Sequence, residues 1–169
     1  MNNYIKLLYC AIFFCFIHSS FVFAVNTEEN SKRKNSFYLE MGGNAGTYSI
    51  NYDLIFYHKN QFSIGGRAGF AIIPTNTCPT VFPVEIYGLY GKSKHYFEYG
   101  LGYSPVIYLG KNSLEPSEML LFRLGYRYQK KQGGFMFRAG FTPIVKNADD
   151  KIGEFRFTPF AGISLGWTF

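Results

Sequence analysis

The last fifteen residues of the chain alternate between two kinds of side chain. One parity is apolar and largely aromatic, and it comprises Phe155, Phe157, Pro159, Ala161, Ile163, Leu165, Trp167 and Phe169. The other parity is mostly small or polar. Because successive side chains of a strand point to opposite faces, this segment predicts a strand with one bulky apolar face and one small polar face. A strand with lipid on one side and a narrow interior on the other needs this distribution.

Eight stretches of this kind follow one another from residue 36 onward, and no stretch shows the period of a helix. They cover residues 36–44, 47–57, 61–72, 80–90, 95–107, 119–129, 135–145 and 155–169. Most of them reach the roughly 9 to 11 residues that a tilted membrane strand needs. The sequence therefore predicts an all-β fold, an eight-stranded antiparallel up-and-down transmembrane β-barrel with a filled polar lumen.

The first 24 residues have the parts of a secretory signal peptide. Lys6 precedes an apolar run over residues 7–17, and the segment ends on the small residue Ala24. A retained anchor is less favoured, because the apolar run is shorter than the roughly 20 residues of a spanning helix. We expect cleavage after Ala24, a flexible periplasmic segment over residues 25–35 and a barrel over residues 36–169.

The inward parity of the predicted strands combines charged residues with glycines. The charged residues are Glu40, Asp53, Arg67, Glu85, Glu98, Arg123, Arg127, Arg138 and Arg156. The interior of an eight-stranded barrel is just wide enough for side chains, and an unpaired buried charge costs several kcal/mol or more. We therefore predict an internal network of salt bridges and no open pore. The alternative, a soluble sandwich with this face in water, would favour lysine and threonine over glycine.

The breaks between strands predict the orientation of the barrel. The breaks 58–60, 91–94 and 129–134 are short, whereas 73–79, 108–118 and 146–154 are longer. Barrels of this class have short periplasmic turns and longer outer loops, so we place the short breaks and both termini on the periplasmic side. The first outer connection, residues 43–46, is an exception in being short.

All seven prolines fall in the outer half of the predicted strands. Proline removes a hydrogen bond from the ladder, and a closed barrel has no free edge on which to hide that loss. Pro143 and Pro159 lie on adjacent strands near the same hairpin, so they could open a lateral gap toward lipid. The simpler alternative is that the prolines end the strands at the rim.

The closing residues 161–169 resemble the last strand of Gram-negative outer-membrane barrel proteins, which end in an aromatic residue that the assembly machinery recognises. The chain from Phe37 onward resembles small eight-stranded barrels of the OmpA-domain and OmpX kind. This resemblance implies a place in the outer membrane, contact with outer-membrane lipids and lipopolysaccharide, and an assembly signal at Trp167 and Phe169. It implies no catalytic residues.

Barrels of the same architecture include lipid A deacylases and palmitoyltransferases. By resemblance, the deacylases use a histidine and a serine near the outer leaflet. After the signal peptide this chain has only His58 and His95, both in predicted periplasmic turns, and the residues two positions on are Asn60 and Phe97. We therefore expect a non-catalytic protein with a structural or surface-presenting role. A lipid A-modifying enzyme and a small channel or lateral conduit for apolar molecules are kept as alternatives.

The composition of the chain limits which partners, cofactors and cross-links we expect. The net charge of +6 would suit nucleic acid, but secretion and the scatter of the charges argue against that partner. Cys78 is the one cysteine outside the leader, so no internal disulfide is expected. The acidic residues near 147–154 lack the spacing of a calcium-binding loop. We expect a monomer without a cofactor or a metal ion.

Overall fold

A computed structural model describes residues 35–75, 78–108, 117–147 and 155–169. The predicted signal peptide, and the predicted periplasmic segment apart from Asn35, lie outside these residues. Within the described ranges, no helix is long and apolar enough to cross a membrane.

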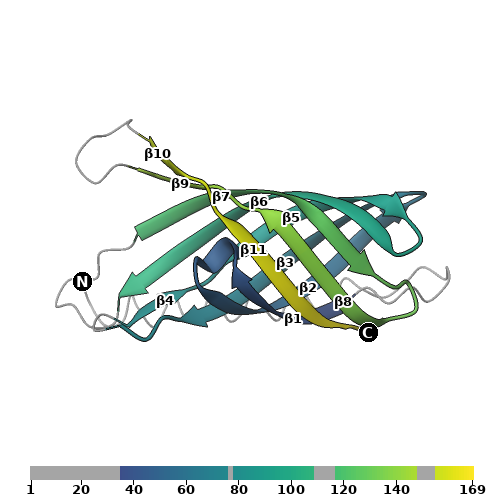
Figure 1. Cartoon of the computed structure of the whole chain (residues 1–169), viewed down its shortest axis with the longest axis horizontal. Coiled ribbons are helices and arrows are strands. Elements are labelled where there is room, and N and C mark those ends of the chain that lie inside the picture. The colour runs from purple at the N-terminus through teal and green to yellow at the C-terminus, as the bar shows by residue number, and fades with distance from the viewer. Residues whose placement is uncertain (1–34, 76–77, 109–116, 148–154) are drawn as a thin grey trace, which may run out of the picture. The chain divides into compact units, whose positions relative to one another are not determined.

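One antiparallel sheet closes on itself to form the barrel (Figure 1). Its longer strands are β1 (Asn35–Gly42), β2 (Tyr48–Lys59), β3 (Phe62–Ile72), β5 (Val84–Lys92), β6 (His95–Tyr108), β7 (Ser117–Gln129), β8 (Gly134–Phe141) and β11 (Ala161–Thr168). The ring closes because β1 pairs with β2 on one side and with β11 on the other.

Three short strands continue longer ones: β4 (Pro79–Val81) precedes β5, β9 (Ile144–Asn147) follows β8, and β10 (Phe155–Thr158) precedes β11. Each pair is separated by two residues that include a proline, at 82–83, 142–143 and 159–160. Proline lacks the N–H that a ladder needs, which explains the interruptions. Because each short strand extends its longer neighbour, the barrel is eight-stranded, and the predicted fold class is confirmed.

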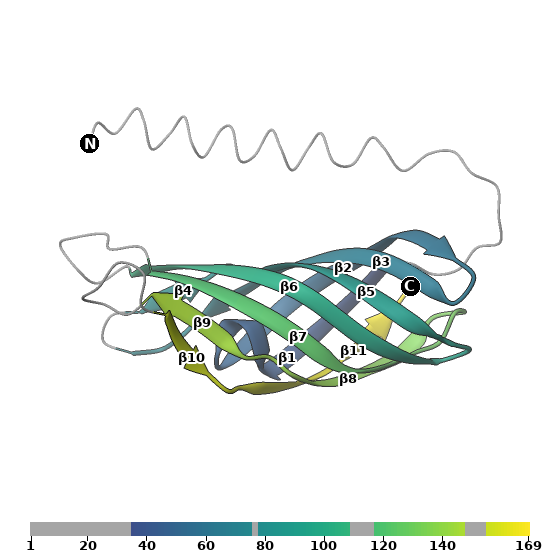
Figure 2. The same cartoon turned by 90° about the horizontal axis from the view of Figure 1, so that it is seen from above.

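The two ends of the barrel differ. Asn35 and Phe169 exchange backbone hydrogen bonds of 3.2 and 2.8 Å, so both chain ends of the barrel lie together. The short turns after β2, β5 and β7 lie at this same end, which we call the terminal end (Figure 1). The other end, which we call the loop end, carries β4, β9, β10 and the turn between β1 and β2 (Figure 2).

Exposure is reversed relative to a water-soluble protein. Outward side chains on the eight longer strands are largely apolar and exposed, for example Leu39 (58%), Ile86 (66%), Leu101 (62%) and Trp167 (60%). Inward side chains in the middle of the barrel are charged and buried. The alternation that the sequence shows is therefore the alternation between the outside and the inside of a closed sheet.

A β-bulge changes the alternation near the end of β2. The pairing between β2 and β3 shifts between Ile55 and Tyr57, so both Phe56 and Tyr57 are exposed. Beyond the bulge, His58 pairs with Ser63 across the hairpin. An extra residue on one strand has this effect, because it moves every later side chain to the other face.

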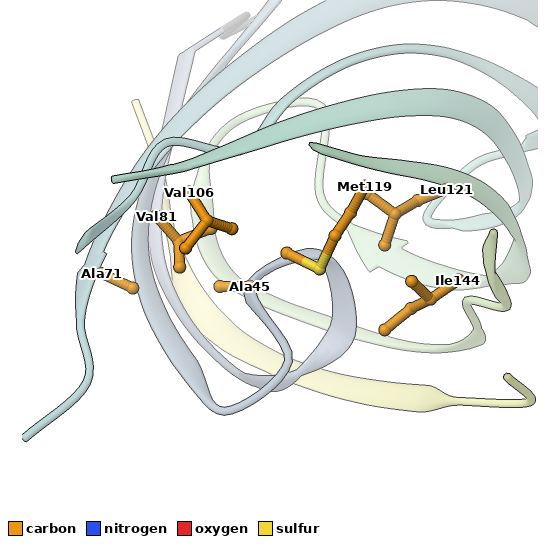
Figure 3. Close-up of a cluster of buried hydrophobic side chains, with 7 residues drawn as sticks. All are labelled: Ala45, Ala71, Val81, Val106, Met119, Leu121 and Ile144. Atoms are coloured by element: carbon orange, nitrogen blue, oxygen red, sulfur yellow. The ribbon is translucent and has the colours of Figure 1, made fainter. Parts of the chain in front are cut away.

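The lumen is not polar along its whole length. Near the loop end it is filled by a buried apolar cluster, which we call the apolar cap (Figure 3). The cap consists of Ala45, Ala71, Val81, Val106, Met119, Leu121 and Ile144. Ala45 belongs to the 3-10 turn η1 (Gly43–Ala45), which lies inside the ring of strands, and the other six residues point inward from the wall. The charged part of the lumen that the sequence predicts lies below this cap, and it shares the interior with a second buried cluster of Tyr87, Leu89 and Tyr96.

Candidate functional site

The charged interior is the candidate site, and its charges balance. Eight charged side chains, each at most 5% exposed, are buried there among the described residues: Glu40, Asp53, Glu85, Glu98, Arg67, Arg123, Arg127 and Arg138. Four carboxylates thus face four guanidinium groups. Because an unpaired buried charge is costly, a narrow lumen tolerates such a set only when it is neutral and hydrogen-bonded.

The prediction for Arg156 is wrong. This arginine was expected in the lumen, but its side chain is exposed on β10. In the described part of the chain β10 pairs with β9 alone, so it extends beyond the closed part of the barrel. Both faces of the strand are exposed there, so its alternation no longer separates an inside from an outside.

One group of charges lies beneath the apolar cap. The Nη2 of Arg123 lies 2.7 Å from the Oε1 of Glu40, and Arg123 Nε lies 3.4 Å from a carboxylate oxygen of Glu85. Arg67 pairs with Glu85 and lies 3.8 Å from Glu40, and its Nη1 donates a hydrogen bond of 2.9 Å to the Tyr38 hydroxyl. Two arginines and two glutamates from four strands therefore form one connected cluster.

Two further ion pairs extend the network toward the terminal end. Arg127 donates from both terminal nitrogens to Asp53, at 2.8 and 2.9 Å, and Arg138 donates from Nε and Nη2 to the two carboxylate oxygens of Glu98. Such bidentate pairs are among the stronger hydrogen-bonded contacts in proteins. Each guanidinium also lies over a buried tyrosine ring, at 5.2 Å for Arg127 over Tyr87 and 4.9 Å for Arg138 over Tyr38.

Asn44 is a member of the site that the sequence analysis missed. It belongs to η1, is fully buried, and donates from Nδ2 to Glu85 while its Oδ1 accepts a 3.0 Å bond from Arg123. The backbone oxygen of Asn44 also accepts a 2.9 Å bond from the Ser104 hydroxyl. The predicted outer connection is therefore folded into the lumen. Its flanking glycines, at left-handed φ angles, are the sequence signal for this turn.

The inward turn supplies a test of this packing. Gly43 and Gly46 both have left-handed φ angles, but a Cβ at Gly43 would overlap the Glu40 carboxyl group, whereas a Cβ at Gly46 would meet nothing within 4 Å. We expect Gly46→Ala to cost about 1 kcal/mol of unfolding free energy through its φ angle. Gly43→Ala should cost a further 1 to 3 kcal/mol, roughly, because it also overpacks the lumen. Equal losses in denaturant titrations of the two variants would contradict the packed turn.

Pro143 and Pro159 do not break the register between their strands. The pairs Phe141↔Ala161 and Ile144↔Thr158 lie on one continuous register, which places the two prolines opposite each other. Thr142 N donates to Phe160 O at 2.7 Å, and Phe122 N donates to Pro143 O at 3.3 Å. The lateral gap predicted between these two strands is therefore bridged. The pairing between β1 and β11 ends at Gly42↔Gly162, and among the residues that the structure describes the other edge of β10 has no strand partner.

The remaining predicted residues lie at the terminal end. Trp167 and Phe169 are exposed on the outer face, and Trp167 pairs with Phe37 and Phe135. His58 lies 2.7 Å from the Ser63 hydroxyl, and His95 lies 2.6 Å from the Tyr126 hydroxyl. Ser63 is buried, so its hydroxyl is not open to a substrate carbonyl. Among the described residues, no three histidine, cysteine or acidic side chains are grouped as a metal site requires.

The geometry resembles that of a known structure. The chain is similar to the crystal structure of the N-terminal β-barrel domain of OprF from Pseudomonas aeruginosa, with a TM-score of 0.53 and 10% sequence identity. The match covers 80% of this chain and 96% of that one. At this identity the likeness concerns the fold alone. No protein-family model and no curated protein matches the sequence. The chain is thus a closed eight-stranded antiparallel barrel of the kind seen in the OprF domain.

Proposed function

We propose that the chain is an integral outer-membrane protein whose barrel is a closed, non-catalytic support or display scaffold. The observation that carries this proposal is the reversal of exposure around the full ring, with apolar and aromatic side chains outside and a neutral ion-pair network inside. Lipid can solvate the apolar wall, and a closed barrel leaves no unpaired edge in the hydrocarbon. The predicted signal peptide and the aromatic terminus suit export and outer-membrane assembly.

The short turns at the terminal end support a periplasmic placement for that end, with the loop end outside the cell. In this orientation the wall contacts phospholipid and lipopolysaccharide, and Trp167 and Phe169 lie at the periplasmic boundary. Aromatic residues are enriched at such boundaries because their rings are amphipathic. The same two residues are our candidates for recognition by the assembly machinery.

A closed lumen is favoured over a channel. Water lining a conducting pore would reach the side chains of the wall, yet Glu40, Asp53 and Arg127 are fully buried. The apolar cap and η1 fill the lumen above them. An enzymatic role is less favoured, because the His58–Ser63 pair lies at the terminal end, away from the outer leaflet, and its serine is buried.

Reconstitution in lipid bilayers tests both parts of the proposal. We expect the refolded chain to float with vesicles, to migrate on gels at a position that changes on boiling, and to give no steady ion conductance in planar bilayers. Recovery of a folded protein in the aqueous fraction would contradict the membrane placement. Steady, reproducible pores from inserted protein would contradict the closed lumen alone.

A further inference from the structure

The three short turns at the terminal end carry positive charge without acidic residues. Their lysine side chains are all exposed, and they are Lys59, Lys92, Lys94, Lys130 and Lys131. In the sequence, the longer connections 109–116 and 148–154 together contain four acidic residues and two lysines. The terminal end of the barrel is therefore basic. This distribution of charge favours an anionic partner on the outer surface near that end.

One part of this basic end is hollowed. A recess of about 360 Å³ lies at the hairpin between β2 and β3, and it is lined by Tyr57, Lys59, Asn60, Gln61, Phe62 and Tyr90. The rings of Tyr57 and Phe62 meet edge to face at 6.5 Å. Gly91 N donates a 2.9 Å hydrogen bond to Gln61 O, which brings the turn that carries Lys92 beside the recess. The recess thus combines an ammonium group, two tyrosines and a second lysine nearby.

An apolar groove of about 730 Å³ continues from the recess along the outer wall, and Phe62 lines both. The groove crosses β3, β5, β6 and β7, which lie side by side (Figure 2), and its far end reaches Pro143 and Phe157 of β10. Ile64, Ile86, Leu101 and Leu124 are among its walls. Gly88 also lines the groove, and the ring of Tyr99 packs over it in the space that a side chain would fill.

We infer that the recess and the groove together bind an anionic glycerophospholipid such as phosphatidylglycerol. Its phosphate would lie near Lys59 and Lys92, with the tyrosine rings at the boundary between headgroup and hydrocarbon. One acyl chain would lie in the groove. Positive charge selects an anionic headgroup, and the apolar continuation of the recess selects a long chain over a soluble phosphate. This inference rests on the proposed function, because it places the terminal end at the periplasmic leaflet.

Lipid retention by the folded barrel in nonionic micelles tests the inference, with native mass spectrometry as the readout. The probes are phosphatidylglycerol and phosphatidylcholine with the same long acyl chains, phosphatidylglycerol with six-carbon chains, and lipid A. The test variant is Lys59→Gln with Lys92→Gln. The matched control is Lys130→Gln with Lys131→Gln, which removes the same charge from the same end of the barrel but away from the recess.

We expect one long-chain phosphatidylglycerol to be retained in preference to phosphatidylcholine and to the short-chain form. The Lys59/Lys92 variant should weaken this retention about tenfold, and the Lys130/Lys131 variant should leave it unchanged. If both variants lost lipid retention equally, the specific site would be overturned, because the lipid would then be held by the general positive charge of this end. Equal retention of phosphatidylcholine, or preferential retention of lipid A, would overturn the assigned ligand. Loss of the heat-dependent gel shift in the unsubstituted protein would count against the proposed function instead.

Discussion

Replacing Arg127 by methionine is expected to lower the free energy of unfolding by about 3 to 5 kcal/mol, because it leaves Asp53 charged, buried and unpaired. Asp53 is fully buried, and Arg127 supplies both of its hydrogen-bonded ion contacts, at 2.8 and 2.9 Å. Urea unfolding of the protein in vesicles, followed by tryptophan fluorescence, measures the change.

The double variant Asp53→Leu with Arg127→Met shows whether stability is lost because the ion pair is absent or because one charge is left without its partner. Replacing both members of a buried pair by apolar residues of similar total volume is often neutral or stabilising. We therefore expect the double variant to recover most of the stability that Arg127→Met loses. Arg156→Met is the matched control, because Arg156 is exposed on β10, and it should change stability by less than about 0.5 kcal/mol. A loss from Arg156→Met as large as that from Arg127→Met would argue against the buried network.

Placing an arginine on the outer wall tests the membrane directly. Leu101 lies midway along β6 with its side chain 62% exposed, and we expect Leu101→Arg to cost about 2 to 4 kcal/mol of stability in vesicles, as arginine does at the bilayer midplane. Ile107 is exposed further along the same strand toward the loop end. Ile107→Arg should therefore cost only about 0 to 1 kcal/mol, because the penalty falls near the interface.

The expected difference in stability between Leu101→Arg and Ile107→Arg depends on whether lipid or water surrounds the barrel, and not on the fold. In water, an arginine at either exposed position would change stability by only about 0.5 kcal/mol. Near-neutral effects at both positions in vesicles would therefore show that the apolar wall does not contact lipid. Refolding yields of both variants, read from the heat-dependent gel shift, confirm that the comparison is made on folded barrels.

The strand pattern was predictable because each strand separates two environments along most of its length. The expected stretch 95–107 corresponds to β6, His95–Tyr108, and its inward Glu98 and outward Leu101 are on the predicted faces. The alternation gives no such information on β10, where both faces are exposed, and the prediction therefore misplaced Arg156. The prolines interrupt strands locally but do not change their register, so the number of strands was unaffected.

Two features depend on local geometry that alternation does not encode. The bulge between Ile55 and Tyr57 moves His58 to the face of Ser63, and no residue in β2 marks its position in the sequence. The inward fold of η1 places Asn44 among Arg123 and Glu85, whereas a short connection between strands predicts an exposed turn. Its stability depends on partners from β5 and β7, which are distant in the sequence.

The ion pairs of the lumen also constrain the order in which the barrel can form. Asp53 and Arg127 are 74 positions apart, and Glu40 and Arg123 are 83 positions apart. Each pair joins an early hairpin to a late one. Before the late strands arrive, Asp53 lacks its ion-pair partner Arg127, and Glu40 has only the 3.8 Å contact with Arg67. An open, partly inserted sheet would expose these charges to acyl chains at a cost of several kcal/mol each. On the proposed membrane placement, we therefore expect insertion and closure to occur together.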